Sequence, residues 1–174
     1  MFIDMVIFQM IFLTFMGERL RRTAVFVQSQ QHLNEAFGFA NALILLTSSW
    51  MVVLAIRAAR TGSGKNTRRY LGLAWLLGLA FCVNKLAEYY HTITSGITPA
   101  SNPFYSYYFF ITFIHFMHVI AGMMFIAYFR SVARASAATK RYVTGLENVG
   151  LFWHFVDVLW IFIFPLLYLV GRVA

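Results

Sequence analysis

Long apolar runs, separated by short polar and charged segments, dominate the chain. Residues 37–56 carry no charged side chain, and residues 148–171 carry only one, Asp157. A helix needs about 20 mostly apolar residues to cross a bilayer core of about 30 Å. Apolar length and helix-breaking residues therefore predict an all-α integral membrane protein, a five-transmembrane-helix bundle that forms a single domain over residues 1–174, with helices near 2–20, 36–59, 70–92, 104–130 and 147–171.

The positive residues in the gaps between these runs predict how the bundle is oriented. Short loops with more Lys and Arg face the cytoplasm. One side of the predicted membrane holds Arg57, Arg60, Lys65, Arg68, Arg69, Arg130, Arg134, Lys140 and Arg141. The other side holds only Arg19, Arg21, Arg22 and Arg172. The N-terminus is therefore expected in the cytoplasm and the C-terminus outside.

The first predicted span is short. As a helix, residues 2–16 would extend only about 22 Å. Either the helix continues into residues 18–22, with the arginine side chains reaching toward the interface, or the sequence begins after the true start of the protein. We expect a missing start.

The composition excludes several other classes of protein. The chain is 60% hydrophobic and 11% charged, far from the composition of soluble domains. Its net charge of +8 comes from residues in the gaps between spans, so we expect no nucleic acid partner. The single Cys82 excludes a disulfide within the chain and any C-x-x-C motif. No cleavable signal pattern is present.

Ionisable side chains inside the predicted spans are the candidate functional residues, because each costs roughly 2.5–3.5 kcal/mol or more at the bilayer centre. Residues three apart share a helix face, so each close pair is expected to point into the bundle. Helical rise places Lys85 and Glu88 near His115, and His118 near Asp157. The full set is Asp4, Lys85, Glu88, His115, His118, His154 and Asp157.

Three interpretations of these groups stay open from the residues alone. In the first, they bond to one another and hold the helices together. In the second, His115 and His118 with another histidine ligate haem, copper or zinc, although no carboxylate or cysteine completes an obvious ligand set. In the third, the carboxylates of Asp4, Glu88 or Asp157 pass protons.

Four motifs resemble subunit III of the haem–copper cytochrome c oxidases. They are NALILLTSS (41–49), KLAEYY (85–90), TFIHFMHVIAG (112–122) and LEN…FWHFVDVLWIFIFPLLYL (146–169), in the order found in that family. The five-span form resembles the short bacterial branch, which includes accessory proteins of nitric oxide reductases.

The resemblance implies a non-catalytic subunit that binds no metal and supports complex stability and proton uptake in aerobic respiration. It implies contact with catalytic subunit I, and with subunit II through the complex, where haem and copper reside. It also implies residence in the bacterial cytoplasmic membrane. The internal polar and aromatic cluster would comprise Lys85, Glu88, His115, His118, Trp153, His154, Asp157 and Trp160.

The resemblance further implies two lipid-related features. Asp4 matches a carboxylate in the first helix that faces lipid in the family. Structural phospholipid is expected in a cleft between the first two helices and the other three, with anionic headgroups paired to Arg57, Arg60, Arg68 and Arg69.

Two alternative functions remain at this stage. One is an accessory protein of a nitric oxide reductase. The other is a free-standing membrane cytochrome that uses His115 and His118.

Overall fold

The computed structural model describes residues 2–31, 33–136 and 139–170, and nearly all of them are helical. The elements are α1 (Phe2–Arg21), α2 (Thr23–Gln31), α3 (Glu35–Arg60), α4 (Gly64–Thr94), α5 (Pro103–Ser136), α6 (Lys140–Phe164) and the short π-helix η1 (Pro165–Leu169). The all-helical prediction is confirmed.

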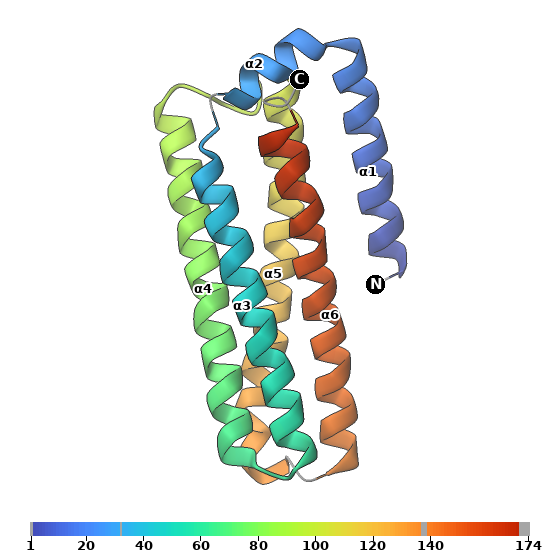
Figure 1. The fold of residues 1–174 in the computed structure, drawn as a ribbon, viewed down its shortest axis with the longest axis vertical. Coiled ribbons are helices and arrows are strands. Elements are labelled where there is room, and N and C mark those ends of the chain that lie inside the picture. Colours follow the sequence, from blue (N-terminus) through green and yellow to red (C-terminus); the bar gives the residue numbers. More distant parts are fainter. Residues whose placement is uncertain (1, 32, 137–138, 171–174) are drawn as a thin grey trace.

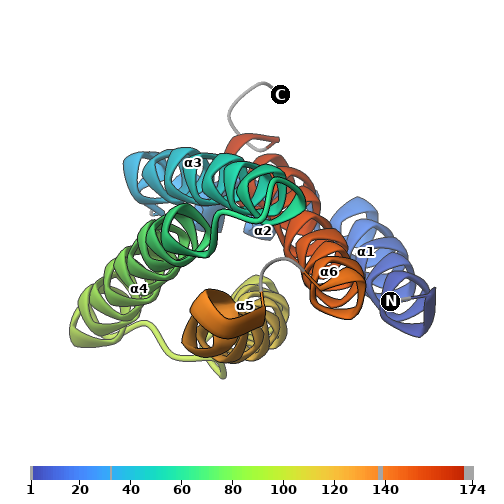
Figure 2. The ribbon, with the colours of Figure 1, turned by 90° about the horizontal axis from the view of Figure 1, so that it is seen from below.

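Four long helices, α3 to α6, run up and down and form the bundle (Figure 1). Seen from one end, α1 stands outside this bundle, next to α6 and far from α4 (Figure 2). Helix α2 lies across one end of the bundle and connects α1 to α3 (Figure 1). The basic ends of α3 and α5 and the basic first turns of α4 and α6 lie together at the opposite end, which we call the basic end (Figure 1).

Four helical segments of the described chain are long and apolar enough to cross a membrane. They are Glu35–Arg60, Gly64–Thr94, Pro103–Ala135 and Lys140–Leu169. Helix α1 is not among them, because Asp4 and Glu18 limit its uncharged stretch to residues 5–17. That stretch extends only about 20 Å as a helix. The chain is therefore a multi-pass membrane protein, and a fifth span is not shown.

The helices extend beyond the apolar runs that predicted them. The predicted helices near 36–59 and 70–92 left residues 60–69 between them, but α4 already begins at Gly64. Only residues 61–63 connect α3 to α4, and Gly62, with a φ of 74°, makes this tight connection. The amides of Gly62 and Ser63 bond to the carbonyls of Ala59 and Ala58, which is a Schellman cap. The apolar length sets the membrane span, whereas the glycine sets the helix end.

Helix α2 was not predicted, because its nine residues form no long apolar run. Its Phe26 is fully buried, with ring centroids 5.3 Å from Phe15 of α1 and 5.6 Å from Phe104 of α5. The side-chain amide of Gln30 donates to the carbonyl of Leu166, 2.9 Å away. These contacts attach α1 and α2 to the end of the bundle.

Pro165 changes the geometry of the last helix. Proline has no amide hydrogen to donate, so the regular α-helical pattern cannot continue through this residue. The amide of Val170 bonds instead to the carbonyl of Pro165, five residues back, at 3.1 Å. The resulting wider turn carries Tyr168, which is 1% exposed and points into the bundle.

Candidate functional site

A buried ion pair lies at the centre of the candidate site. Lys85 and Glu88 are one turn apart on α4, and Lys85 Nζ lies 3.0 Å from Glu88 Oε2. Lys85 is 0% exposed and Glu88 is 4% exposed. Both side chains therefore point into the bundle from one helix face, as predicted.

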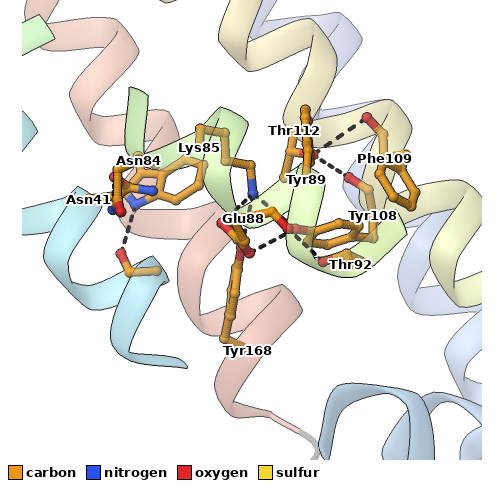
Figure 3. A network of polar contacts seen from close by, with 12 residues as sticks. Asn41, Asn84, Lys85, Glu88, Tyr89, Thr92, Tyr108, Phe109, Thr112 and Tyr168 are labelled. Carbon is orange, nitrogen blue, oxygen red and sulfur yellow. Dashed lines mark hydrogen bonds and ion pairs between the residues drawn. The ribbon is translucent and has the colours of Figure 1, made fainter. Parts of the chain in front are cut away.

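Two tyrosines from other elements hydrogen-bond to this ion pair (Figure 3). Lys85 Nζ donates to the hydroxyl of Tyr108 on α5 at 3.2 Å and to that of Tyr168 on η1 at 3.0 Å. Both hydroxyls in turn donate to Glu88 Oε1, the one from Tyr108 at 2.7 Å. All three donors of the ammonium group are used, so neither charge is left without hydrogen bonds. We call Lys85, Glu88, Tyr108 and Tyr168 the Lys–Glu–Tyr cluster.

Aromatic rings surround the ammonium group as well. Lys85 Nζ lies 4.7 Å from the ring centroid of Tyr108, 5.0 Å from Tyr89 and 5.4 Å from Trp160. The faces of aromatic rings attract a cation, most strongly where water is excluded. The cluster therefore stabilises a charge that would be costly in this environment without these contacts.

His115 does not join the cluster, so its predicted pairing with Lys85 and Glu88 is wrong. The imidazole is fully buried, and neither ring nitrogen hydrogen-bonds to a described residue. It packs instead between Phe81 and Trp160, with ring centroids 5.7 Å and 5.1 Å away. The tyrosines of the cluster take the polar positions that the sequence had suggested for His115.

The predicted pairing of His118 with Asp157 is also wrong. His118 faces α1, where its Nε2 lies 3.6 Å from Asp4 Oδ1. Its Nδ1 lies 2.9 Å from the carbonyl oxygen of Ile114, which can only accept a hydrogen bond. Nδ1 must therefore carry a hydrogen, and Nε2 faces the Asp4 carboxylate.

Asp4 was expected to face lipid. Its side chain is 30% exposed, so it is only partly accessible, and it lies beside His118. The ring of His118 packs against Phe8 of α1, with centroids 5.6 Å apart. Asp4 and Phe8 together form a contact between α1 and α5 about halfway along the bundle.

His154 and Asp157 belong to a separate group that faces α3. His154 Nδ1 hydrogen-bonds to the hydroxyl of Ser49 and lies 4.0 Å from Asp157 Oδ2. Asp157 is 4% exposed, and its carboxylate lies near the Ser49 hydroxyl, without a hydrogen bond of regular geometry to the described donors. The segment FWHFVD (152–157) thus places one hydrogen-bonded histidine and one buried carboxylate at the contact between α3 and α6.

Two tryptophans on the same helix, Trp153 and Trp160, are fully buried core residues. Trp160 donates from Nε1 to the carbonyl oxygen of Gly38 at 3.2 Å and so links α6 to α3. Trp153 packs against Gly122, where an added Cβ would lie only 2.6 Å from its ring. The absence of a side chain at Gly122 lets α5 and α6 approach closely around Trp153.

No group of three or more His, Cys, Asp or Glu side chains within the described residues is arranged to hold a metal ion. His115 is enclosed by aromatic rings, and His118 is engaged by a carbonyl and a carboxylate. The geometry therefore does not bring the two histidines together as a ligand set.

Comparison with known proteins identifies the family. The family described as cytochrome c oxidase subunit III matches residues 1–172. The chain belongs to the cytochrome c oxidase subunit III family. It is 30% identical over 168 residues to the cytochrome bo(3) ubiquinol oxidase subunit 3 of Pseudomonas aeruginosa, which covers 97% of this chain and 80% of that protein.

Two further relatives carry similar names. The chain is 32% identical over 143 residues to cytochrome c oxidase subunit 3 of Corynebacterium diphtheriae, which covers 82% of this chain and 70% of that protein. It is 32% identical over 130 residues to the cytochrome bo(3) ubiquinol oxidase subunit 3 of Buchnera aphidicola, at 75% and 67% coverage. Subunit III relatives thus occur in oxidases named for two different electron donors.

The predicted headgroup arginines of this subunit III-family chain separate into two groups. Arg60 forms an ion pair with Glu147, with Arg60 Nη2 lying 2.8 Å from Oε1, and Arg57 is exposed on the same helix. Arg68 and Arg69 instead line a cavity between α4 and α5 at the basic end. The sequence could not separate these groups, because all four residues lie near one loop.

Neither tyrosine of the Lys–Glu–Tyr cluster was predicted from the sequence. Tyr108 lies in the aromatic segment YSYYFF, and Tyr168 lies beyond a proline. One signal was available: a lysine and a glutamate three residues apart inside a span require buried hydrogen-bonding partners. Tyrosine hydroxyls on neighbouring spans can be such partners, because they both donate and accept hydrogen bonds.

Proposed function

We propose that this chain is a non-catalytic accessory subunit of a bacterial haem–copper oxidase in aerobic respiration. Its family membership and relatives named as subunits of cytochrome c and ubiquinol oxidases support the proposal. The same names favour an oxidase over a nitric oxide reductase as the parent complex.

In this proposal, haem and copper reside in the partner subunits, and this chain contacts catalytic subunit I and, through the complex, subunit II. The interior histidines support this location of the haem and copper in other subunits, because aromatic rings enclose His115 and Ser49 hydrogen-bonds to His154. A free-standing cytochrome built on His115 and His118 is not favoured, since their side chains contact different helices.

The chain would lie in the bacterial cytoplasmic membrane with five spans, α1 being the fifth. Exposed apolar residues of α1, including Ile3 at 72% and Leu13 at 61%, suit contact with lipid or with a partner subunit. The positive residues gathered at the basic end support a cytoplasmic location for that end. The N-terminus would accordingly be cytoplasmic and the C-terminus outside.

The interior polar groups would serve first to fix the helix arrangement. Lipid offers little hydrophobic drive for helix association, so hydrogen bonds and close packing decide which faces meet. The Lys–Glu–Tyr cluster connects α4, α5 and η1, while Ser49 and His154 connect α3 to α6. We propose support of proton uptake and retention of structural phospholipid as the functions this scaffold serves in the complex.

Deletion and complementation would test this function. A strain that lacks the gene should assemble less oxidase, or an oxidase that loses activity sooner during turnover, and the wild-type gene should restore it. Oxygen consumption and haem content of the membranes provide the two readouts. Unchanged activity, lifetime and haem content in the deletion strain would contradict the proposal.

A further inference from the structure

A cavity of about 620 Å³ lies between α4 and α5 at the basic end. Five cationic side chains line it: Lys65, Arg68 and Arg69 from the first turns of α4, and Arg130 and Arg134 from the end of α5. We call it the α4–α5 basic groove. Helix α4, which forms one wall of this groove, stands on the side of the bundle away from α1 (Figure 2).

The helix packing brings these cations together. An added Cβ at Gly64 would lie 2.7 Å from the carbonyl oxygen of Ala133, so α4 begins in close contact with α5. An added Cβ at Gly72 would lie 3.0 Å from Arg130 Nε, so the arginine side chain lies directly over this glycine. The Arg130 side chain therefore crosses from α5 to α4, about one turn beyond Arg68.

The positive charge of the groove is not balanced within the described part of the chain. Its described lining contains no aspartate or glutamate. Arg60, near the same end, differs because Glu147 pairs with it at 2.8 Å. Five like charges in one cavity repel one another unless an anion joins them, so the groove is suited to a ligand with more than one negative charge.

The rest of the lining indicates a lipid rather than a soluble anion. Beyond the cations, the groove continues along α4 past Leu73, Trp75 and Leu76, and Leu76 is 57% exposed. From Lys65 to Leu76 the helix rises about 16 Å, from the basic end toward the middle of the bundle. A charged end followed by an apolar surface along the helix matches a phospholipid headgroup and its acyl chains.

We propose that the α4–α5 basic groove binds an anionic phospholipid that carries two phosphates. The inference rests on the proposed lipid-retaining function and specifies its site and its headgroup. Basic pockets between transmembrane helices on the cytoplasmic side bind such multiply charged headgroups. The headgroup contacts are Lys65, Arg68, Arg69, Arg130 and Arg134, whereas Arg57 and Arg60 lie outside the groove.

The test uses the purified full chain in nanodiscs that contain cardiolipin, which has two phosphates, and phosphatidylglycerol, which has one, at equal phosphate content. Native mass spectrometry then measures the lipid retained by the chain. We expect one cardiolipin to be retained in preference to phosphatidylglycerol. Removing one cation should lower retention about fivefold, so Arg68→Gln with Arg130→Gln should lower it about 25-fold.

Arg141→Gln is the matched control, because Arg141 is an exposed arginine at the same end that does not line the groove. It should retain cardiolipin as the wild type does. Unchanged retention in the double variant, or an equal loss in the control, would overturn the assignment of the site. Circular dichroism verifies that the variants keep their helices.

Competition between cardiolipin and phosphatidylglycerol for the wild-type chain tests the proposal without any variant. Equal retention of phosphatidylglycerol and cardiolipin would overturn the two-phosphate specificity. Displacement of the lipid by pyrophosphate at equal concentration would identify a soluble polyanion as the ligand and overturn the lipid. Because no oxidase partner takes part in the assay, its failure would leave the proposed accessory function standing, and failure of that function would leave this result unaffected.

Discussion

Lys85 Nζ and Glu88 Oε2 lie 3.0 Å apart in the interior of the helix bundle, on adjacent turns of α4. Their side chains are 0% and 5% exposed. Desolvation of two charges can exceed their mutual attraction, so such a pair is stable only with good geometry and further hydrogen bonds. Tyr108 and Tyr168 provide those bonds from α5 and η1, which makes the pair an attachment point for three elements.

We predict that Lys85→Met destabilises the bundle strongly. The substitution leaves Glu88 as an unpaired buried carboxylate, a change that costs about 3–5 kcal/mol. Unfolding of the purified chain in mixed micelles, followed by circular dichroism, measures the loss. The double variant Lys85→Met with Glu88→Leu should recover most of it, and Lys140→Met at an exposed position should have little effect. Equal losses in the double and single variants would contradict a paired role.

Tyr168→Phe should lower the free energy of unfolding by about 1–3 kcal/mol. The ring remains, but Lys85 and Glu88 each lose a buried hydrogen-bonding partner. The same unfolding assay applies. Tyr90→Phe is the control, because Tyr90 is 74% exposed and should change the free energy by less than about 0.5 kcal/mol. Similar values for the two variants would remove Tyr168 from the cluster.

His118→Leu should loosen α1 without unfolding α3 to α6. His118 connects α5 to α1 through Asp4 and through ring packing against Phe8. Limited proteolysis should then cut faster between α1 and α3, while the thermal transition of the bundle stays close to that of the wild type. Met117→Leu, a neighbouring exposed position, serves as the control. Unchanged proteolysis in His118→Leu would show that the Asp4–His118 contact does not hold α1.

Asp157→Leu should leave the bundle as stable as the wild type or more stable. His154 keeps its bond to Ser49, and Leu removes a buried carboxylate that lies outside hydrogen-bonding geometry. Unfolding in mixed micelles measures the change, with Asp157→Asn as a nearly isosteric comparison. A loss above about 2 kcal/mol would show that the carboxylate has a stabilising partner in the membrane. Slower oxidase turnover at unchanged stability would assign Asp157 a role in the reaction.

The apolar runs of the sequence were sufficient to locate α3, α4, α5 and α6, because a bilayer requires a minimum apolar length. They did not locate the helix ends, which depend on Gly62 and on polar turns that continue beyond the membrane. Helix α2 was missed for a related reason. It is held by contacts of Phe26 and Gln30 with distant elements, and these leave no periodic pattern in the sequence.

The sequence was sufficient to identify the buried polar residues, but not the residues to which they bond. Residue spacing shows that Lys85 and Glu88 share a face, and depth along the helix limits which groups can meet. Rotation of each helix about its own axis is set by packing, and it turns His118 toward α1 and His115 toward Trp160. The π-helical turn that brings Tyr168 to Lys85 begins at Pro165, but a proline in the sequence does not show that the chain continues as a wider turn instead of ending the helix.

Purification of the tagged full chain from membranes of its own host tests whether it is an accessory subunit of a haem–copper oxidase. Mass spectrometry and a reduced-minus-oxidised haem spectrum of the purified material provide the readouts. We expect a large haem-bearing oxidase subunit in equal amount, and a haem spectrum that disappears when the chain is separated from it. A chain that purifies alone, or that keeps haem after separation, would contradict this role.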